Sequence, residues 1–157
     1  MGSGKSTVGR CLARASDRYF LDTDALIETS HKQTIAEIFA NAGEAQFRLY
    51  ERDLAAWLAA FVKGAVISSG GGMPTVCDNL REIGFVVYLQ CDFETIKDRL
   101  DHEAERDKRP LAVSIDTLCD KFVSRQEIYE RSADLIVDAT QSVKVITDTI
   151  MSQKGAQ

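Results

Sequence analysis

The sequence is poor in the residue types that usually mark extracellular, metal-stabilised or membrane-spanning proteins. It has four cysteines and two histidines among 157 residues, and the cysteines form no C-x-x-C pair. This spacing argues against a structural zinc site and a disulfide framework, as is typical of proteins from a reducing cytoplasm. The longest apolar runs are much shorter than a membrane span, and the N-terminus has no signal-peptide pattern. We therefore expect a cytoplasmic protein without a membrane partner.

An excess of positive charge is also absent. The chain has 19 Lys and Arg residues against 24 Asp and Glu residues, for a net charge of −5. No overall basic field would attract nucleic acid, so nucleic acid is not expected as a partner. Any anionic ligand must be held by cations that gather locally. With 45% hydrophobic residues, the chain is expected to form one globular domain over residues 1–157.

Helical and strand patterns alternate along the whole chain. A capping box at Thr34 and Glu37 predicts one helix start, and a run of three glycines follows the strand pattern at 65–69. The patterns predict strands at 19–22, 65–69, 85–89 and 135–137, and helices at 8–15, from 34, after Gly43, from about 75, at 92–101, at 116–132 and from about 142. This alternation indicates an α/β fold with a parallel sheet flanked by helices on both faces.

The segment at about 102–114 does not fit the alternation. It is charged, aperiodic and interrupted by Pro110. One interpretation is an exposed surface loop, and the other is a lid that closes over a nucleotide.

The opening stretch MGSGKST contains most of a phosphate-binding loop. In the pattern G-x-x-x-x-G-K-[ST], Lys5 would reach the β- and γ-phosphates and the Ser6 hydroxyl would bind Mg²⁺. A glycine-rich helix cap is the alternative, but it would not require a lysine beside a serine. The first glycine of the pattern would fall ahead of Met1, as would the strand that delivers the loop.

Two aspartates follow the first predicted strand. On an extended strand, Asp22 and Asp24 would point to the same side, at the carboxyl edge where open α/β sheets bind ligands. Phosphoryl transfer needs one carboxylate near Mg²⁺ and another near the attacking hydroxyl. The alternative is that Asp24 caps a helix that begins at Ala25.

Two arginines differ in their surroundings. Arg48 lies between Glu44 and Glu51 at helical spacing, which is also the pattern of a solvated helix face. Arg125 lies on an apolar stripe that should face the interior, where a charge needs a partner such as a ligand carboxylate. Arg99 and Arg109 have no such context and by default are surface residues.

The ordered set of motifs resembles the shikimate kinase family. The matching stretches are GSGKST at 2–7, LDTD at 21–24, IFANAGEAQFRLYE at 38–51, SGGG at 69–72, KRPL at 108–111 and R-x-x-x-Y at 125–129. The resemblance implies a P-loop kinase that transfers the γ-phosphate of ATP to the 3-hydroxyl of shikimate, on the pathway to chorismate and the aromatic amino acids. It also implies a monomer with the strand order 2-3-1-4-5, and the first, central strand would be absent from this chain.

The resemblance also implies roles for individual residues. Lys5, Asp24 and Arg109 would be catalytic, with Asp24 orienting and deprotonating the shikimate hydroxyl and Arg109 arriving with the lid. Mg²⁺ would be bound by Ser6 directly and by Asp22 through water, and Glu51 would steady Arg48. ATP would be bound by Gly2, Ser3, Gly4, Lys5, Ser6, Thr7, Arg99 and Arg109. Shikimate would be bound by Asp24, Arg48, Gly70, Gly71, Gly72 and Arg125.

Two departures from the family pattern stand out. The lid has Ala112 where a second leucine is common, and the strand before the phosphate loop is missing. We expect a true start about 6 to 10 residues upstream of Met1, which would restore one strand. The alternatives are a non-catalytic remnant, whose sheet would have unpaired edges, and another small-molecule or nucleotide kinase on the same fold.

Overall fold

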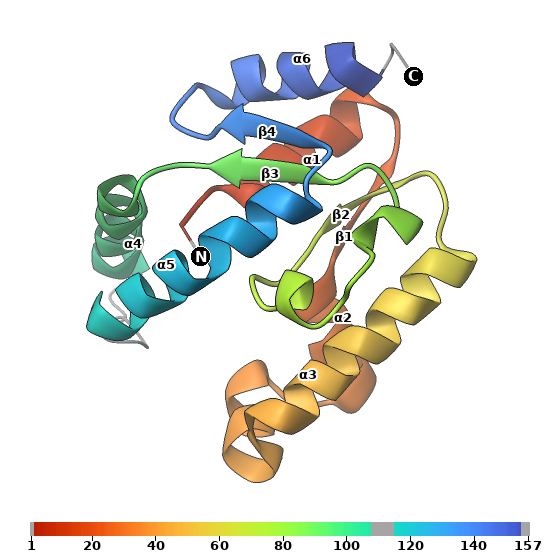
Figure 1. Ribbon diagram of the computed structural model, residues 1–157, viewed down its shortest axis with the longest axis vertical. Coiled ribbons are helices and arrows are strands. Elements are labelled where there is room, and N and C mark those ends of the chain that lie inside the picture. Colours follow the sequence, from red (N-terminus) through yellow and green to blue (C-terminus); the bar gives the residue numbers. More distant parts are fainter. Residues whose placement is uncertain (1, 108–114, 155–157) are drawn as a thin grey trace.

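The computed structural model describes residues 2–107 and 115–154. Four short strands alternate with helices, as the sequence predicts (Figure 1). The strands are β1 (Tyr19–Asp22), β2 (Ala65–Ser68), β3 (Val87–Gln90) and β4 (Leu135–Asp138). The α-helices are α1 (Lys5–Ala15), α2 (Thr23–His31), α3 (Ile35–Phe61), α4 (Phe93–Asp107), α5 (Ile115–Ser132) and α6 (Val143–Lys154).

The ends of the helices follow local signals in the sequence. Thr34 and Glu37 form the predicted capping box, in which each side chain accepts a hydrogen bond from the other residue's backbone N–H. Gly43 interrupts α3 with a φ of 80°, which joins two helical stretches across a kink. The two helices predicted on either side of Gly43 are therefore both present, joined at this kink within α3.

The strands form two parallel pairs within the described part of the chain. β1 pairs with β2 from Tyr19 opposite Ala65, and β3 pairs with β4 from Val87 opposite Leu135. No ladder joins β2 to β3 among the described residues. Between the pairs lies a cleft of 310 Å³, which we call the central cleft. Its walls include Val66, Ile67, Val86 and Val87, with Val8 and Leu12 from α1. An α/β fold with parallel strands is thereby confirmed, and the predicted gap in the sheet is present.

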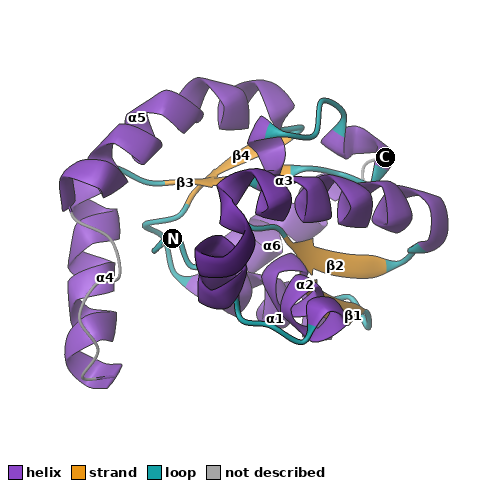
Figure 2. Ribbon diagram, turned by 90° about the horizontal axis from the view of Figure 1, so that it is seen from below, coloured by secondary structure: helices purple, strands orange, loops and turns teal. Residues whose placement is uncertain are grey.

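Helices cover both faces of the strands (Figures 1 and 2). α1 and α6 pack against each other on one face, whereas α3 and α5 approach the other face through the short helix η1 (Met73–Thr75). The largest buried cluster joins α1, β3, α4, β4 and α6, and includes Val8, Leu89, Ile96, Val137 and Ile146. This cluster fastens the phosphate loop helix to the β3–β4 pair.

The helix predicted from about Thr75 is wrong. Two 3-10 turns, η1 and η2 (Leu80–Glu82), occupy this stretch instead. Pro74 lies in the first turn of η1, and the apolar side chains Met73 and Leu80 are buried rather than arranged along one helical stripe. Burial of these two residues against α3 therefore decides the local conformation.

The segment predicted as a loop or lid divides between two parts. α4 extends to Asp107, so residues 102–107 are helical. The run Glu103, Ala104, Glu105 and Arg106 consists of strong helix formers, which explains the longer helix. The rest of the predicted lid, with Arg109, lies outside the described residues.

Candidate active site

The phosphate loop leads directly into α1. Gly4 precedes the helix with a φ of 83°, a left-handed conformation that suits glycine. No side chain caps this N-terminus, so its backbone N–H groups point outward from the first turn. A helix N-terminus of this kind favours an anion such as a phosphate group.

Asp22 ends β1 beside this loop. Its Oδ2 atom accepts a hydrogen bond of 3.3 Å from the Ser6 hydroxyl, and its Oδ1 atom accepts bonds of 3.1 and 3.4 Å from the backbone N–H groups of Asp24 and Ala25. Asp22 is therefore the cap of α2, and the interpretation that Asp24 caps a helix from Ala25 is wrong. One carboxylate both fixes the start of α2 and holds a second oxygen next to Ser6.

Lys5 and Asp24 influence each other's protonation. Burial lowers the pKa of Lys5, although Asp24 and Asp22 oppose this change by favouring the ammonium form. Burial also raises the pKa of Asp24 from its ordinary value of 3.8, and the neighbouring Asp22 charge adds to the rise. Asp24 thus binds a proton more readily than an exposed aspartate does, as suits a group that accepts a proton.

The Arg48 guanidinium is held by two carboxylates of α3, one that precedes it in the sequence and one that follows it. It donates to Glu51 at 2.5 Å and forms an ion pair with Glu44, both within α3. The Glu51 side chain is fully buried, and its Oε1 atom has no hydrogen-bond partner within the described residues. Burial raises the pKa of Glu51, and Arg48 offsets part of this rise. Arg48 is therefore more than a solvated surface residue, because it compensates a buried charge.

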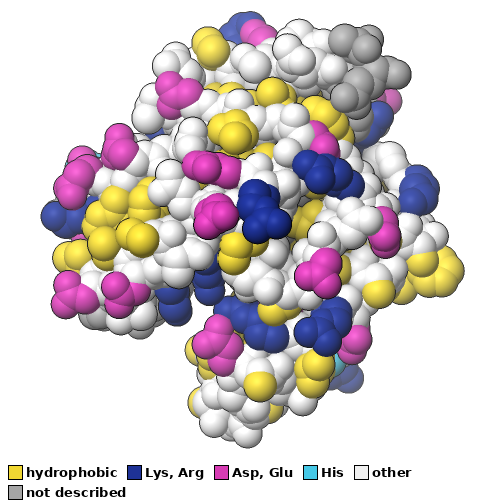
Figure 3. Space-filling model, in the orientation of Figure 1, with side chains coloured by type: hydrophobic (Ala, Val, Ile, Leu, Met, Phe, Trp, Pro, Cys, Tyr) yellow, Lys and Arg dark blue, Asp and Glu magenta, His cyan; other side chains and the backbone are white. Residues whose placement is uncertain are grey.

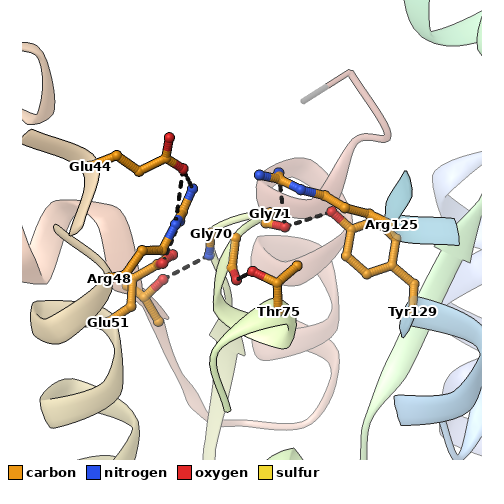
Figure 4. Close-up of polar contacts among 10 residues, drawn as sticks. Glu44, Arg48, Glu51, Gly70, Gly71, Thr75, Arg125 and Tyr129 are labelled. Atoms are coloured by element: carbon orange, nitrogen blue, oxygen red, sulfur yellow. Dashed lines mark hydrogen bonds and ion pairs between the residues drawn. The ribbon is translucent and has the colours of Figure 1, made fainter. Parts of the chain in front are cut away.

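The three glycines after β2 form a turn tied from three directions (Figure 4). The Gly70 N–H donates to the buried Thr23 hydroxyl at 2.8 Å, and the Thr75 hydroxyl donates to the Gly72 carbonyl at 2.6 Å. On the other side, the Gly71 carbonyl accepts bonds from side chains of α5. We call residues 70–72 the glycine turn.

Two of the three glycines lie very close to charged side chains. A Cβ atom at Gly70 would overlap the Asp24 carboxylate, and one at Gly72 would overlap the Arg48 guanidinium. The glycine turn therefore lies against both of these side chains, with Arg125 on its other side. Residues that the sequence suggested for the acceptor substrate thus converge around one turn, although they come from α2, α3 and α5.

Arg99 has well-defined partners in the structure. Its guanidinium donates to the Ala139 carbonyl at 2.7 Å and to the Gly2 carbonyl at 3.4 Å. It thereby links α4 to the phosphate loop and to the residue that follows β4. The predicted contact with adenine is not tested by this arrangement.

Two residues of the site gave no signal in the sequence. Thr23 and Thr75 hold the glycine turn, yet neither was assigned a role from its context. A threonine after a strand or within a short turn is common, and only the contact across the fold distinguishes these two. Within the described residues, no group of three or more His, Cys, Asp or Glu side chains could hold a metal ion.

The surface around these residues is hollowed. Figure 3 shows Lys and Arg side chains on both sides of the hollow between the lobe formed by α2 with the start of α3 and the rest of the molecule. Such a concentration of cations on an acidic chain is expected where anionic ligands bind.

Comparison with known proteins decides the family. The shikimate kinase family model matches residues 1–154. The chain belongs to the shikimate kinase family. A shikimate kinase from Helicobacter hepaticus is 40% identical over 151 residues, which cover 96% of this chain and 89% of the relative. One from Bacillus mycoides is 38% identical over 156 residues, covering 96% and 91%.

Solved structures agree with the sequence relatives. A shikimate kinase from Acinetobacter baumannii in complex with shikimate matches with a TM-score of 0.84 at 34% identity, over 99% of this chain and 89% of that one. This similarity confirms the P-loop kinase fold, and the family membership confirms a shikimate kinase activity. Within the described part of the chain, no helix is both long and apolar enough to cross a membrane.

Proposed function

We propose that this shikimate kinase uses Asp24 as the base that accepts the proton of the shikimate 3-hydroxyl while ATP donates its γ-phosphate. The observation that carries the proposal is the glycine turn, against which Asp24, Arg48 and Arg125 all lie. The raised pKa of Asp24 supports proton acceptance, and its electrostatic interaction with Lys5 supports a base on the phosphate side of the site.

The two arginines bind the carboxylate of shikimate in this proposal. Arg48 is braced by Glu51 and Glu44, and Arg125 is braced by the Gly71 carbonyl. A guanidinium held in this way loses little freedom when it pairs with a carboxylate. The backbone of the glycine turn then meets the ring hydroxyls.

ATP occupies the phosphate loop from Gly2 to Thr7, with Lys5 on the phosphates. Ser6 and, through water, Asp22 would hold Mg²⁺, which would neutralise charge on the phosphate oxygens when bound. Because Mg²⁺ commonly takes only one or two protein ligands besides water and phosphate, two adjacent side-chain oxygens suit it. Arg99 contacts the adenine side, and Arg109 approaches the γ-phosphate. We further propose that the protein is a cytoplasmic monomer.

The test is ADP formation that depends on shikimate, with ATP and Mg²⁺, by the 157-residue chain. Asp24→Asn should lower kcat by a factor of about 10² to 10⁴, the usual contribution of a positioned base. Asp53→Asn changes an exposed carboxylate on α3 and should leave the rate unchanged. Equal rates for Asp24→Asn and the unmodified chain would refute the role of Asp24, and no turnover by any form would favour the non-catalytic alternative.

A further inference from the structure

The hydroxyl of Tyr129 lies where α5 meets the glycine turn. It donates to the Gly71 carbonyl at 2.6 Å, and Arg125 Nη1 donates to the same oxygen at 3.2 Å (Figure 4). Tyr129 follows Arg125 by four residues, so both side chains project from one face of the helix. The two donors occupy both lone pairs of the carbonyl oxygen.

The two hydrogen bonds to the Gly71 carbonyl also fix the direction of the Gly72 N–H. In a planar trans peptide, the C=O of Gly71 and the N–H of Gly72 point in opposite directions. With the carbonyl bound to α5, the Gly72 N–H points away from that helix. Neither Gly71 N–H nor Gly72 N–H has a hydrogen-bond partner among the described residues, so both are unpaired donors beside the two arginines.

Three consecutive glycines would otherwise be free to adopt many conformations. Thr23 and Thr75 restrain the two ends of the turn, and Tyr129 restrains its middle. The Tyr129 ring packs on the Tyr88 ring of β3, with a distance of 5.4 Å between the ring centroids. This contact fixes the position of the Tyr129 ring relative to the β3–β4 pair. Restraints made before binding reduce the entropy lost when a ligand binds.

We propose that Tyr129 is a positioning residue for shikimate, acting through the Gly71–Gly72 peptide and through the Arg125 guanidinium. By binding the Gly71 carbonyl, the Tyr129 hydroxyl orients the Gly72 N–H toward the hydroxyl groups of the shikimate ring. Arg125 donates to the same carbonyl, so Tyr129 also helps to fix the orientation of the Arg125 guanidinium. This inference rests on the proposed roles of Arg125 and the glycine turn. In this inference Tyr129 makes no contact with ATP or with the reacting atoms.

The experiment measures shikimate affinity by calorimetry without ATP, together with KM for both substrates, kcat and Tm. Tyr129→Phe removes only the hydroxyl and should weaken shikimate binding by a factor of about five to ten, the effect of one hydrogen bond. KM for ATP should stay at the unmodified value, and Tm should fall by no more than about 4 °C, because Arg125 still donates to the Gly71 carbonyl. Tyr88→Phe is the matched control, because it removes a hydroxyl from the contacting ring that makes no hydrogen bond to the glycine turn within the described residues.

A double-variant cycle separates positioning from structure. If Tyr129 acts through Arg125, the effect of Tyr129→Phe should shrink in an Arg125→Lys background. Unchanged shikimate affinity in Tyr129→Phe, fully additive effects, or a fall in Tm with equal losses for both substrates would each overturn the inference. If the unmodified chain itself fails to bind shikimate, the proposed function fails and this inference fails with it.

Discussion

The glycine turn follows β2, whereas the central cleft runs along β2, and the two are built in opposite ways. Around the turn, Thr23, Thr75 and Tyr129 satisfy backbone groups across three elements. The cleft between β2 and β3 is lined mainly by apolar side chains. Among the described residues, no strand pairs with the edges of β2 and β3 that border the cleft. The turn is polar and restrained, whereas the cleft is apolar and open.

The difference shows that the substrate side of the site does not need a continuous sheet. Its contacts come from β1, β2, α2, α3 and α5, which reach one another through side chains. The two strand pairs are instead joined by α1, which packs against β1, β2 and α6. Substitutions at the turn should therefore alter function, and substitutions at the cleft should alter stability only modestly.

The largest expected effect concerns packing. Leu58 is fully buried, and Leu58→Ala should lower the free energy of unfolding by about 2 to 5 kcal/mol because it leaves a cavity. Ile67 lines the central cleft, so Ile67→Ala creates no new enclosed cavity and should cost no more than about 2 kcal/mol. Chemical denaturation measures both. Equal losses would mean that the cleft is closed in solution.

The next effect concerns the close contact at Gly72. Gly72→Ala should displace the Arg48 guanidinium from Glu51 and raise KM for shikimate by about 10- to 100-fold, the loss expected for a charge-assisted contact. Gly84→Ala is the matched control, since a Cβ there meets nothing within 4 Å. Steady-state kinetics with varied shikimate gives both values. An unchanged KM in Gly72→Ala would show that Arg48 does not depend on the turn.

A smaller effect concerns the pH dependence of stability. Because the pKa of Asp24 is raised in the folded state, the unfolded chain releases this proton first as pH rises, and stability then falls. The penalty is absent below the ordinary pKa of 3.8, grows as the pH rises above it, and is complete above the raised pKa of the folded state. Asp24→Asn should therefore raise Tm slightly at pH 7 and not at lower pH, with Asp53→Asn as control. A lower Tm at pH 7 would contradict this sign.

The smallest effect is expected at the surface of the β3–β4 pair. Arg81 donates to Asp134 at 2.6 Å, but its side chain is 54% exposed. Arg81→Met should cost at most about 1 kcal/mol of stability and leave KM for shikimate unchanged. Chemical denaturation at low and high salt measures the change in stability, and steady-state kinetics measures KM. A change in KM would show that the β3–β4 pair controls the substrate side after all.

Much of the fold could be predicted from local patterns. The capping box at Thr34, the four strands and the starts of α1, α4, α5 and α6 depend on neighbouring residues in the sequence, and these were predicted to within a few residues. The helix predicted from about Thr75 was wrong because burial against α3 overrides a short local pattern. Asp22 rather than Asp24 caps α2, because α2 begins at Thr23 directly after β1 and Asp24 already lies in its first turn.

The sequence by itself determined which chemical groups the protein has: a phosphate loop, two aspartates after a strand, and arginines that need carboxylate partners. Only the tertiary structure decided which of them meet. Arg125 and Tyr129 lie 54 and 58 residues from Gly71, and no local pattern records that they share its carbonyl. The physical reason is that periodicity reports which face of an element is buried, whereas the partner across that face is chosen by the packing of the whole chain.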